Sequence, residues 1–412
     1  MILEIALATS HLHTKIEDVK TYSNTEMEKA VQSAKSTRPA NAEEALLGRD
    51  AREVETKAGE QIWIAVTDYT KGGNLEGSIS NFLEQNLKIG PTPLEVLKKD
   101  VVFAAKEQGV VVKAFPKMKG SFHEFVREIS SSDIMKDLKL SFGSSVAILG
   151  VGKCSVNGVE HLLLAMTLAP GKEIERYVDA IFNSSDRASA IQTCKRILSH
   201  YGKSLAELHK QKVIQANGTP EVLKITSEYT KQKIEKYLGA YKKKGGKDSE
   251  EIEKFFQRQW EKYDATVFYF TLHHGNPHLE NALYDESSDK TVFIDINRMH
   301  MSVDQNGTPL VAEYQEDVAR AEDELARVVL SHEMNESLIT ELTEAFHEGY
   351  VKEAGGLYIP SHFEMEKAFR FFYQIRMTFA WETVSDEKKR EYKHRIHDYY
   401  LSYFLNSVEQ TN

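Results

Sequence analysis

The stretch Leu272–Arg298 reads LHHGNPHLENALYDESSDKTVFIDINR and consists of short apolar runs separated by polar loops. His274–Pro277 combines Gly, Asn and Pro, which together predict a turn. The two apolar runs that follow, 281–284 and 291–294, enclose an acidic, serine-containing segment, and this pattern predicts a hairpin. The second run delivers Asp295 at its end, so the hairpin is expected to present a carboxylate close to the turn.

Oxygen-bearing side chains recur along this stretch, at Asn276, Asn281 and Asp295. Amide and carboxylate oxygens are ligands that a hard cation such as Mg²⁺ accepts. A turn next to two such ligands can face a hydroxyl group. These are the elements that a magnesium-dependent phosphoryl transfer requires.

The segment His274-Gly-Asn-Pro-His-Leu-Glu-Asn281 resembles the catalytic loop of the aminoglycoside phosphotransferase and choline kinase group, which shares the protein-kinase-like fold. That loop usually reads His-Gly-Asp, four residues, Asn, and a later Ile-Asp follows it. The resemblance implies that Asn281 and Asp295 bind Mg²⁺ and that the chain uses ATP. It also places His274 and Asn276 at catalytic positions.

Asn276 departs from the family pattern, because the family has an Asp there as the general base. An amide can hydrogen-bond a hydroxyl group but cannot take its proton at neutral pH. A positioned base contributes roughly 10²–10⁴ in rate. Three alternatives follow from Asn276: a slow kinase, a pseudokinase, or an inactivating substitution that traps substrate.

The composition predicts a soluble, cytoplasmic protein. The chain has 412 residues, 41% of them hydrophobic and 28% charged, which favours a body of two lobes. Its two cysteines exclude a disulfide framework and a cysteine-rich zinc site. A formal net charge of −10 disfavours a nucleic-acid binder. The sequence contains no apolar run of the roughly 18 residues that a membrane helix needs.

The first 60 residues are polar and poor in aromatic side chains, which predicts an extension outside the catalytic body. Residues 61–67 (QIWIAVT) predict a strand. The glycine-rich segment 71–78 follows, either as a loop over a nucleotide or as a plain surface turn. Thr92–Glu95 has the composition of a helix start, although the residues after it also suit a hairpin.

Val110–Phe115 (VVVKAF) predicts a strand whose Lys113 faces away from its apolar neighbours. The pentad around Lys113 resembles the family strand whose lysine holds the α- and β-phosphates. A lysine in a partly dry cleft needs a carboxylate partner. The amphipathic helix 121–129 supplies Glu128 at the position that the resemblance implies, with Glu124 as the alternative.

Residues 145–151 and 161–168 predict a buried hairpin with its turn at Asn157-Gly158. The break that follows resembles the family hinge between lobes. This resemblance implies that backbone groups around Met166 and Leu168 hold adenine.

The rest of the chain is predicted to be helical, apart from an apolar strand over 265–272. Residues 188–210 and 311–330 show helical spacing, and a charged linker at 242–248 separates two further helices. His209 is predicted to be a packing residue. The acidic residues in 311–330 predict either a solvated face or, by the resemblance, a cleft for a cationic acceptor.

The order of these segments predicts an α+β, two-lobed, protein-kinase-like fold. A small antiparallel sheet (61–168) follows the extension (1–60), and a large helical lobe (169–412) carries the catalytic loop. The expected function is ATP- and Mg²⁺-dependent phosphotransfer to a hydroxyl of a small molecule. The alternatives are a kinase-like enzyme that modifies a protein and a nucleotide-binding pseudokinase.

Overall fold

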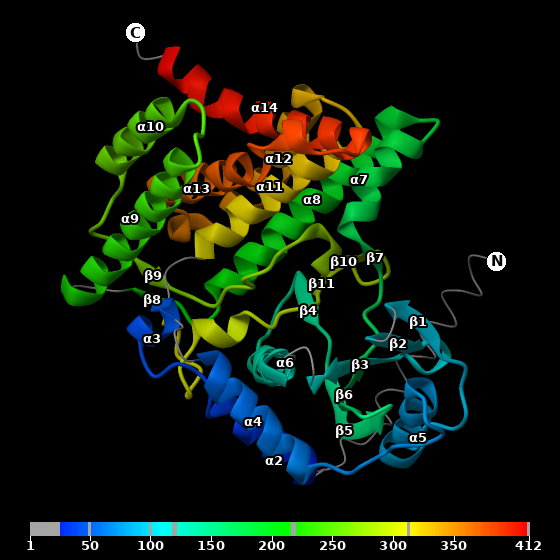
Figure 1. Cartoon of the computed structure of the whole chain (residues 1–412). Coiled ribbons are helices and arrows are strands. Elements are labelled where there is room, and N and C mark those ends of the chain that lie inside the picture. Colours follow the sequence, from blue (N-terminus) through cyan, green and yellow to red (C-terminus); the bar gives the residue numbers. More distant parts are fainter. Residues whose placement is uncertain are drawn as a thin grey trace. The chain divides into compact units, whose positions relative to one another are not determined.

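The computed structural model describes residues 25–47, 51–98, 101–117, 122–215, 220–310 and 314–409 (Figure 1). The chain forms two compact units. The first unit contains Met1–Lys139, Ser144–Gly171 and Asp285–Thr308. The second contains Leu140–Gly143, Lys172–Tyr284 and Pro309–Asn412. The segment with Asp295 thus joins the first unit, while the turn with Asn276 belongs to the second.

The first unit is built on a five-stranded sheet in the order β1-β2-β3-β6-β5. Each pair of neighbouring strands is antiparallel. The predicted turn at Asn157-Gly158 joins β5 to β6, and both residues have positive φ (50° and 75°), as a tight hairpin turn requires. The strands are β1 (Glu95–Lys98), β2 (Val102–Ala105), β3 (Val110–Pro116), β5 (Ile148–Val156) and β6 (Val159–Thr167).

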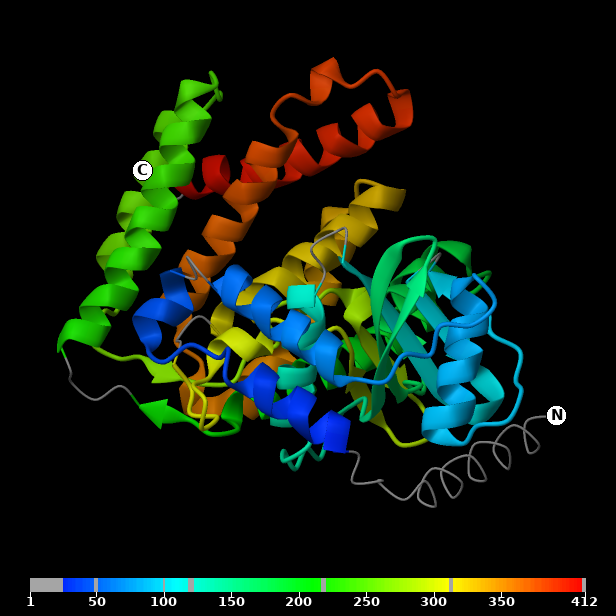
Figure 2. The ribbon, with the colours of Figure 1, turned by 60° about the horizontal axis from the view of Figure 1, so that its bottom comes forward.

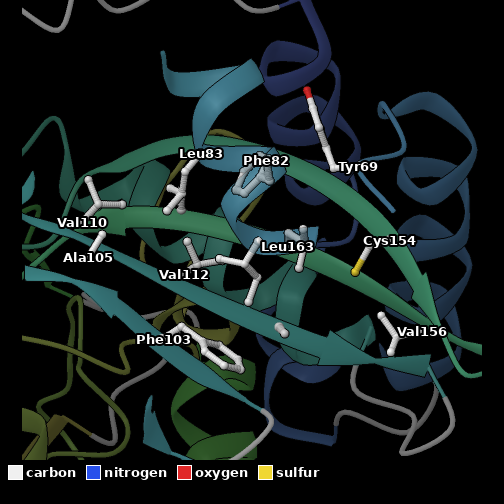
Figure 3. Packing of buried hydrophobic residues seen from close by; sticks show 13 residues of the cluster. Tyr69, Phe82, Leu83, Phe103, Ala105, Val110, Val112, Cys154, Val156 and Leu163 are labelled. Carbon is white, nitrogen blue, oxygen red and sulfur yellow. The ribbon is translucent and has the colours of Figure 1, made fainter. Parts of the chain in front are cut away.

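One face of this sheet packs against helix α5 (Leu75–Leu87), and Figure 3 shows the buried side chains between them. Phe82 and Leu83 of α5 lie over Val112 and Leu163 of the central strands. The Tyr69 ring lies so close to β5 that position 152 requires glycine, because a Cβ there would lie 2.8 Å from the ring. The glycine-rich segment 71–78 forms the turn before α5 and the first turn of that helix, where Gly77 N–H donates to the N-cap Asn74 at 2.6 Å.

The opposite face carries helix α6 (Phe122–Met135), which confirms the predicted helix. Residues 113 and 115 of β3 share this face, because side chains alternate along a strand. Phe115 meets Phe125 of α6 edge to face, with ring centroids 5.4 Å apart. The helix that carries Glu128 is therefore seated on the face that carries Lys113.

Helices α2 (Thr25–Lys35), α3 (Ala42–Leu47) and α4 (Ala51–Ala65) precede the sheet. The predicted strand over 61–67 is wrong, because α4 runs through most of it. Ala58 and Ile62 are buried at helical spacing, and a short apolar run cannot distinguish a strand from a buried helix. The helix start at 92–95 is not followed by a helix, because the chain enters β1 there. The hairpin alternative for the residues that follow is present as the pair β2 and β3.

The second unit is mostly helical (Figures 1 and 2). Helices α8 and α12 pack closely where Gly202 and Gly349 cross. A Cβ at either position would lie 2.2 Å or 2.1 Å from a backbone oxygen of the other helix. The helices are α7 (Ile174–Asn183), α8 (Arg187–Lys210), α9 (Pro220–Lys243), α10 (Ser249–Lys262), α11 (Tyr314–His332), α12 (Glu336–Ala354), α13 (Pro360–Thr378) and α14 (Glu387–Glu409).

Three helical predictions are confirmed: α8 covers 188–210, α11 covers the described part of 311–330, and the linker 242–248 separates α9 from α10. The remaining short strands are β4 (Gly143–Ser145), β7 (Lys172–Glu173), β8 (Ile214–Gln215), β9 (Tyr269–Phe270), β10 (Ala282–Asp285) and β11 (Lys290–Phe293). The predicted strand 265–272 shrinks to β9. The polar loop before Asp295 lies between β10 and β11, as the hairpin pattern predicted.

The α+β class, with a small antiparallel sheet in the first unit and a large helical second unit, is confirmed. Among the described helices, none is both long enough and apolar enough to cross a membrane.

Candidate functional site

Lys113 lies in the middle of β3, the strand between β2 and β6. Its neighbours Val112 and Ala114 are buried in the core against α5. Strand alternation therefore directs Lys113 to the opposite face, where its side chain is 18% exposed. An ammonium group at this depth requires charged partners.

Two carboxylates meet Lys113 Nζ within the first unit. Glu128 Oε1 lies 3.0 Å away and Asp295 Oδ1 lies 2.7 Å away. The predicted pairing of Lys113 with Glu128 rather than Glu124 is therefore present. Asp295 comes to the same ammonium from 182 residues further along the chain.

The environment of the three groups is reflected in their pKa values. Burial alone would lower the pKa of Lys113, but the charges of Glu128 and Asp295 outweigh burial and raise it, so the ammonium stays charged. Burial raises the pKa of Glu128, and Lys113 opposes that effect. Glu128 is 2% exposed and Asp295 is 45% exposed. Asp295 is thus the carboxylate of the pair that solvent or a ligand can reach.

Asp295 has an unusual backbone conformation, with φ of +54°. This left-handed region is uncommon for residues other than glycine, although Asp tolerates it better than most. The surroundings must hold the residue there, because such a conformation has an energetic cost. The result is a carboxylate fixed after β11 and aimed at Lys113.

The residues predicted to hold adenine lie at the end of β6. Met166 is buried and faces Val111 of β3 and Ile148 of β5 in the sheet. The Leu168 N–H already donates to Gly109 O at 2.7 Å, so only other backbone groups there are available to a base. An adenine-binding role for Met166 and Leu168 stays a prediction, as does a nucleotide-covering role for 71–78.

In the second unit the turn at 274–277 is tied together by its own polar groups. Gly275 has φ of +76°. The Asn276 N–H donates to His274 Nδ1 at 3.3 Å, and the Asn281 amide donates to Asn276 O at 3.0 Å. Asn281 is buried, and its amide nitrogen is used in holding the loop. His274 therefore supports the backbone from inside, while Asn281 directs its oxygen away from that bond.

Asp317 of α11 anchors this turn. Its carboxylate accepts from His274 N–H at 2.7 Å and from Gly275 N–H at 2.9 Å. His209 Nε2 lies 3.2 Å from the same carboxylate, and His209 Nδ1 lies 2.8 Å from the Tyr350 hydroxyl. Burial would raise the pKa of Asp317, but the His209 hydrogen bond and nearby histidines lower it, so the carboxylate is charged.

From the sequence, His209 is predicted only to pack, and Asp317 is one of the acidic residues of the helix predicted over 311–330. The structure joins the two residues in one buried network. The sequence gives only a weak signal of this network. Asp317 lies between Tyr314 and Val318, at a position where helical periodicity predicts an apolar residue.

Asn276 itself is contacted by Arg320, which was not predicted. Arg320 Nη1 lies 3.5 Å from Asn276 Oδ1, and Arg320 Nη2 donates to Glu316 Oε1 at 2.7 Å. Lys233 of α9 reaches the same Glu316 at 3.2 Å. The side-chain oxygen of Asn276 thus accepts from a buried guanidinium, and its NH₂ group is the end that remains to meet a ligand.

The acidic residues of α11 do not form a solvated face. Glu322 and Asp323 are buried, Glu316 and Glu324 are half-buried, and all four are paired with cations or hydroxyls of the second unit. The partners are Arg320 and Lys233 for Glu316, His347 and Lys367 for Glu322, Arg370 and Tyr400 for Asp323, and His278 for Glu324. These pairs engage the charges of the acids, and a cleft for a cationic acceptor stays a prediction. Glu313 lies outside the described residues.

The donor set permits magnesium without a dedicated cage. No group of three or more His, Cys, Asp and Glu side chains within the described part of the chain is arranged to hold a metal. Mg²⁺ is usually held by one or two protein ligands together with substrate phosphates and water. The half-exposed carboxylate of Asp295 and the amide oxygen of Asn281 are ligand types that fit this kind of binding.

We expect the Asp317→Asn variant to be less stable by roughly 2–4 kcal/mol, because its new NH₂ group would face backbone N–H donors and leave buried groups unpaired. Thermal unfolding of both proteins measures the loss. Asp398→Asn is the control, since Asp398 is about half exposed in its contact with His394 and should change stability by under about 0.5 kcal/mol. Equal melting of all three proteins would contradict the anchoring role.

No family model matches the sequence, and no curated protein matches it. Among solved structures, a glucosamine kinase is 10% identical, with a TM-score of 0.49 over 88% of this chain and 85% of its own. Glucosamine kinase in complex with glucosamine, ADP and inorganic phosphate is 12% identical, with a TM-score of 0.45 over 73% and 77% of the two chains. Plasmodium vivax ethanolamine kinase is 11% identical, with a TM-score of 0.42 over 85% and 95%. These likenesses give no family assignment for the chain.

Proposed function

We propose that this protein is an ATP- and Mg²⁺-dependent phosphotransferase of kinase-like fold that acts on a hydroxyl group of a small molecule. The observation that carries the proposal is the contact of Lys113 with both Glu128 and Asp295. A charged lysine on a central strand, held by one buried and one half-exposed carboxylate, is suited to gripping phosphate oxygens.

Four residues share three tasks in this proposal. Lys113 binds phosphate oxygens of ATP, and Glu128 keeps its ammonium charged and aimed. Asp295 of the first unit and Asn281 of the second unit are each proposed as a ligand of Mg²⁺, which when bound neutralises charge on the phosphates. The fixed left-handed backbone at Asp295 supports this role, because strained conformations persist where the surroundings require them.

The turn 274–277 is proposed to face the acceptor. Its backbone is fixed by Asp317 and His274, so a side chain at position 276 is held in one place. Asn276 presents hydrogen-bond donors there and orients a hydroxyl group without taking its proton. Transfer by the protein as it stands is therefore expected to be slow.

A second function is favoured by the same residue. With an amide at position 276 and Lys113, Glu128 and Asp295 retained, a protein that binds nucleotide without transferring phosphate has all the groups it needs. The difference between the two functions is the rate of transfer and not the affinity for ATP.

Calorimetric titration with ATP tests the nucleotide claim. We expect binding in the presence of Mg²⁺ and a strong loss of affinity when EDTA removes it, since the carboxylate of Asp295 would otherwise repel the phosphates. Binding that EDTA leaves unchanged, or no binding at all, would refute the nucleotide site. ADP release with a panel that includes glucosamine, ethanolamine and aminoglycosides then separates transfer from binding alone.

A further inference from the structure

Glu55 of α4 is a fully buried carboxylate that joins three segments of the first unit. Both of its oxygens accept from Arg127 Nε, each at 2.9 Å. His300 Nε2 lies 3.2 Å from Glu55 Oε1, and the side chains of Glu55 and His300 are 0% exposed. Arg127 is on α6, and His300 is on the 3₁₀ turn η4 (Met299–Ser302). One carboxylate therefore bridges α4, α6 and η4.

These contacts adjoin the residues around Lys113 along the chain. Arg127 directly precedes Glu128, and His300 lies five residues after Asp295. A further bond links the same two segments without Glu55, since the His300 N–H donates to Ser131 Oγ of α6 at 2.9 Å. The position of Glu55 thus bears on both carboxylates that hold the Lys113 ammonium.

The helices before the sheet pack tightly on α6. A Cβ at Gly59 would lie 2.8 Å from Phe122 Cβ, and Trp63 stacks on Phe122 with centroids 6.2 Å apart. Arg38, which follows α2, donates to Ser130 Oγ at 2.8 Å and pairs with Asp133 at 3.1 Å. Helix α4 and the end of α2 consequently support α6, and the extent of the predicted N-terminal extension, residues 1–60, stays a prediction.

Burying a carboxylate is costly unless charged partners and hydrogen bonds compensate. Burial would raise the pKa of Glu55, but the nearby His300 and the hydrogen-bonded Arg127 outweigh burial and lower it. Burial lowers the pKa of His300 despite the nearby carboxylate. A charged Glu55 between Arg127 and a neutral His300 is a specific arrangement that an apolar side chain cannot reproduce.

We propose that Glu55 is a positioning residue for nucleotide binding: through Arg127 and His300 it sets α6 and the segment after Asp295, and so fixes Glu128 and Asp295 around Lys113. This inference rests on the proposed function. The residues proposed to touch the phosphates stay the same, and Glu55 acts on them through α6 and η4. The helices before the sheet are thereby part of the nucleotide-binding machinery.

The Glu55→Gln variant tests the proposal, with Glu53→Gln as its matched control on the same helix. Glu53 makes an exposed pair with Lys57, so its loss leaves α6 untouched. We expect Glu55→Gln to weaken Mg²⁺–ATP binding about tenfold, because Glu128 and Asp295 would be displaced from Lys113. A displacement of about 1 Å can lower a reaction rate by about 10²-fold. Hydrogen exchange of 122–135 and 299–302 should also become faster in Glu55→Gln alone. Unchanged affinity in Glu55→Gln, with wild-type exchange, would overturn the proposal.

A double-variant cycle distinguishes positioning from general destabilisation. If Glu55 acts through Glu128, then Glu55→Gln should add less than about twofold to the loss already caused by Glu128→Gln. Additive losses would show that Glu55 does not act through Glu128 and would overturn the proposal. If Glu55→Gln does not fold, Ser131→Ala replaces it, since that change removes only the α6–η4 bond, and an unaltered ATP affinity in Ser131→Ala would then count against the proposal.

The exchange measurement separates this inference from the proposed function. A wild-type protein that binds no ATP would refute the nucleotide site and with it the role of Glu55 in binding. Faster exchange of both segments in Glu55→Gln would still establish the mechanical link in that case. Slow exchange in Glu55→Gln, together with ATP binding by the wild type, would leave the proposed function standing and refute the inference.

Discussion

Replacing Lys113 by alanine is expected to reduce Mg²⁺–ATP affinity by about 10- to 100-fold, the equivalent of one hydrogen bond to a charged group. Phosphate transfer, where it is measurable, should fall by a further factor of about 10² because the lysine also stabilises charge in the transition state. The loss follows from geometry: Lys113 is the cation between Glu128 and Asp295 in the first unit. Calorimetry and ADP release measure the two effects.

The control for this variant is Lys106→Ala. Lys106 lies in the same sheet region but makes an exposed ion pair with Glu95. Its removal should leave ATP affinity within about twofold of the wild type, as exposed pairs contribute little. Equal affinity of the Lys113→Ala protein and the Lys106→Ala protein would mean that ATP does not contact Lys113.

The Lys113→Ala variant should also change the ionisation of its partner. Burial raises the pKa of Glu128, and Lys113 is the charge that opposes this. Without the lysine, Glu128 is expected to take up a proton more readily and so to lose its charge. The single variants Lys113→Ala and Glu128→Ala therefore break the same ion pair. The double variant should lose little more affinity than either single variant, whereas fully additive losses would contradict their pairing.

Local signals explain what the sequence could predict. The Asn157-Gly158 turn, the alternation around Lys113 and the amphipathic helix with Glu128 each depend on neighbours within a few residues. All three are present in the structure. The approach of Asp295 to Lys113 has no such local signal, and the sequence did not predict this direct contact.

The residues that the sequence could not reveal are buried charges. Glu55 meets Arg127 over 72 residues, and Asp317 meets His274 and Gly275 over 43 and 42 residues. A charged residue in a helical pattern predicts an exposed face, since most charges are exposed. The wrong strand prediction over 61–67 also concerns burial. The sequence shows that Ile62 is apolar, but it does not show which side chains Ile62 packs against.

Asn276 is the position where one substitution is expected to have the largest gain. Phosphoryl transfer draws most of its barrier reduction from alignment and electrostatic stabilisation, and the turn at Asn276 is already fixed by Asp317. A carboxylate added there supplies a base to a site that is otherwise arranged. We therefore expect Asn276→Asp to raise acceptor-dependent ADP release by about 10²-fold, the lower end of what a positioned base contributes.

Arg320 is expected to control the ionisation of the carboxylate that Asn276→Asp introduces. Its guanidinium lies 3.5 Å from the present side-chain oxygen of Asn276, so it would face one oxygen of the new carboxylate and favour its charged form. The carboxylate introduced by Asn276→Asp would then be ionised throughout the neutral range, and the gain should be flat from about pH 6 to 8, well above the usual pKa of an aspartate. Folding stability should change by under about 1 kcal/mol, because Asp and Asn are nearly isosteric and the new charge has a partner.

The rate measurement compares wild type, Asn276→Asp and Asn276→Ala across aminoglycosides, amino alcohols and amino sugars. The Asn276→Ala protein should stay within about tenfold of the slow wild type, since an amide supplies orientation but no proton acceptor. ATP hydrolysis without acceptor is measured in parallel, because an unsuitable panel would hide a working base, whereas water is always available as an acceptor. Negligible and equal rates in all three proteins, with intact folding, ATP binding and unchanged hydrolysis, would favour the nucleotide-binding protein over the phosphotransferase. A gain confined to Asn276→Asp would show that the rest of the transfer machinery is in place.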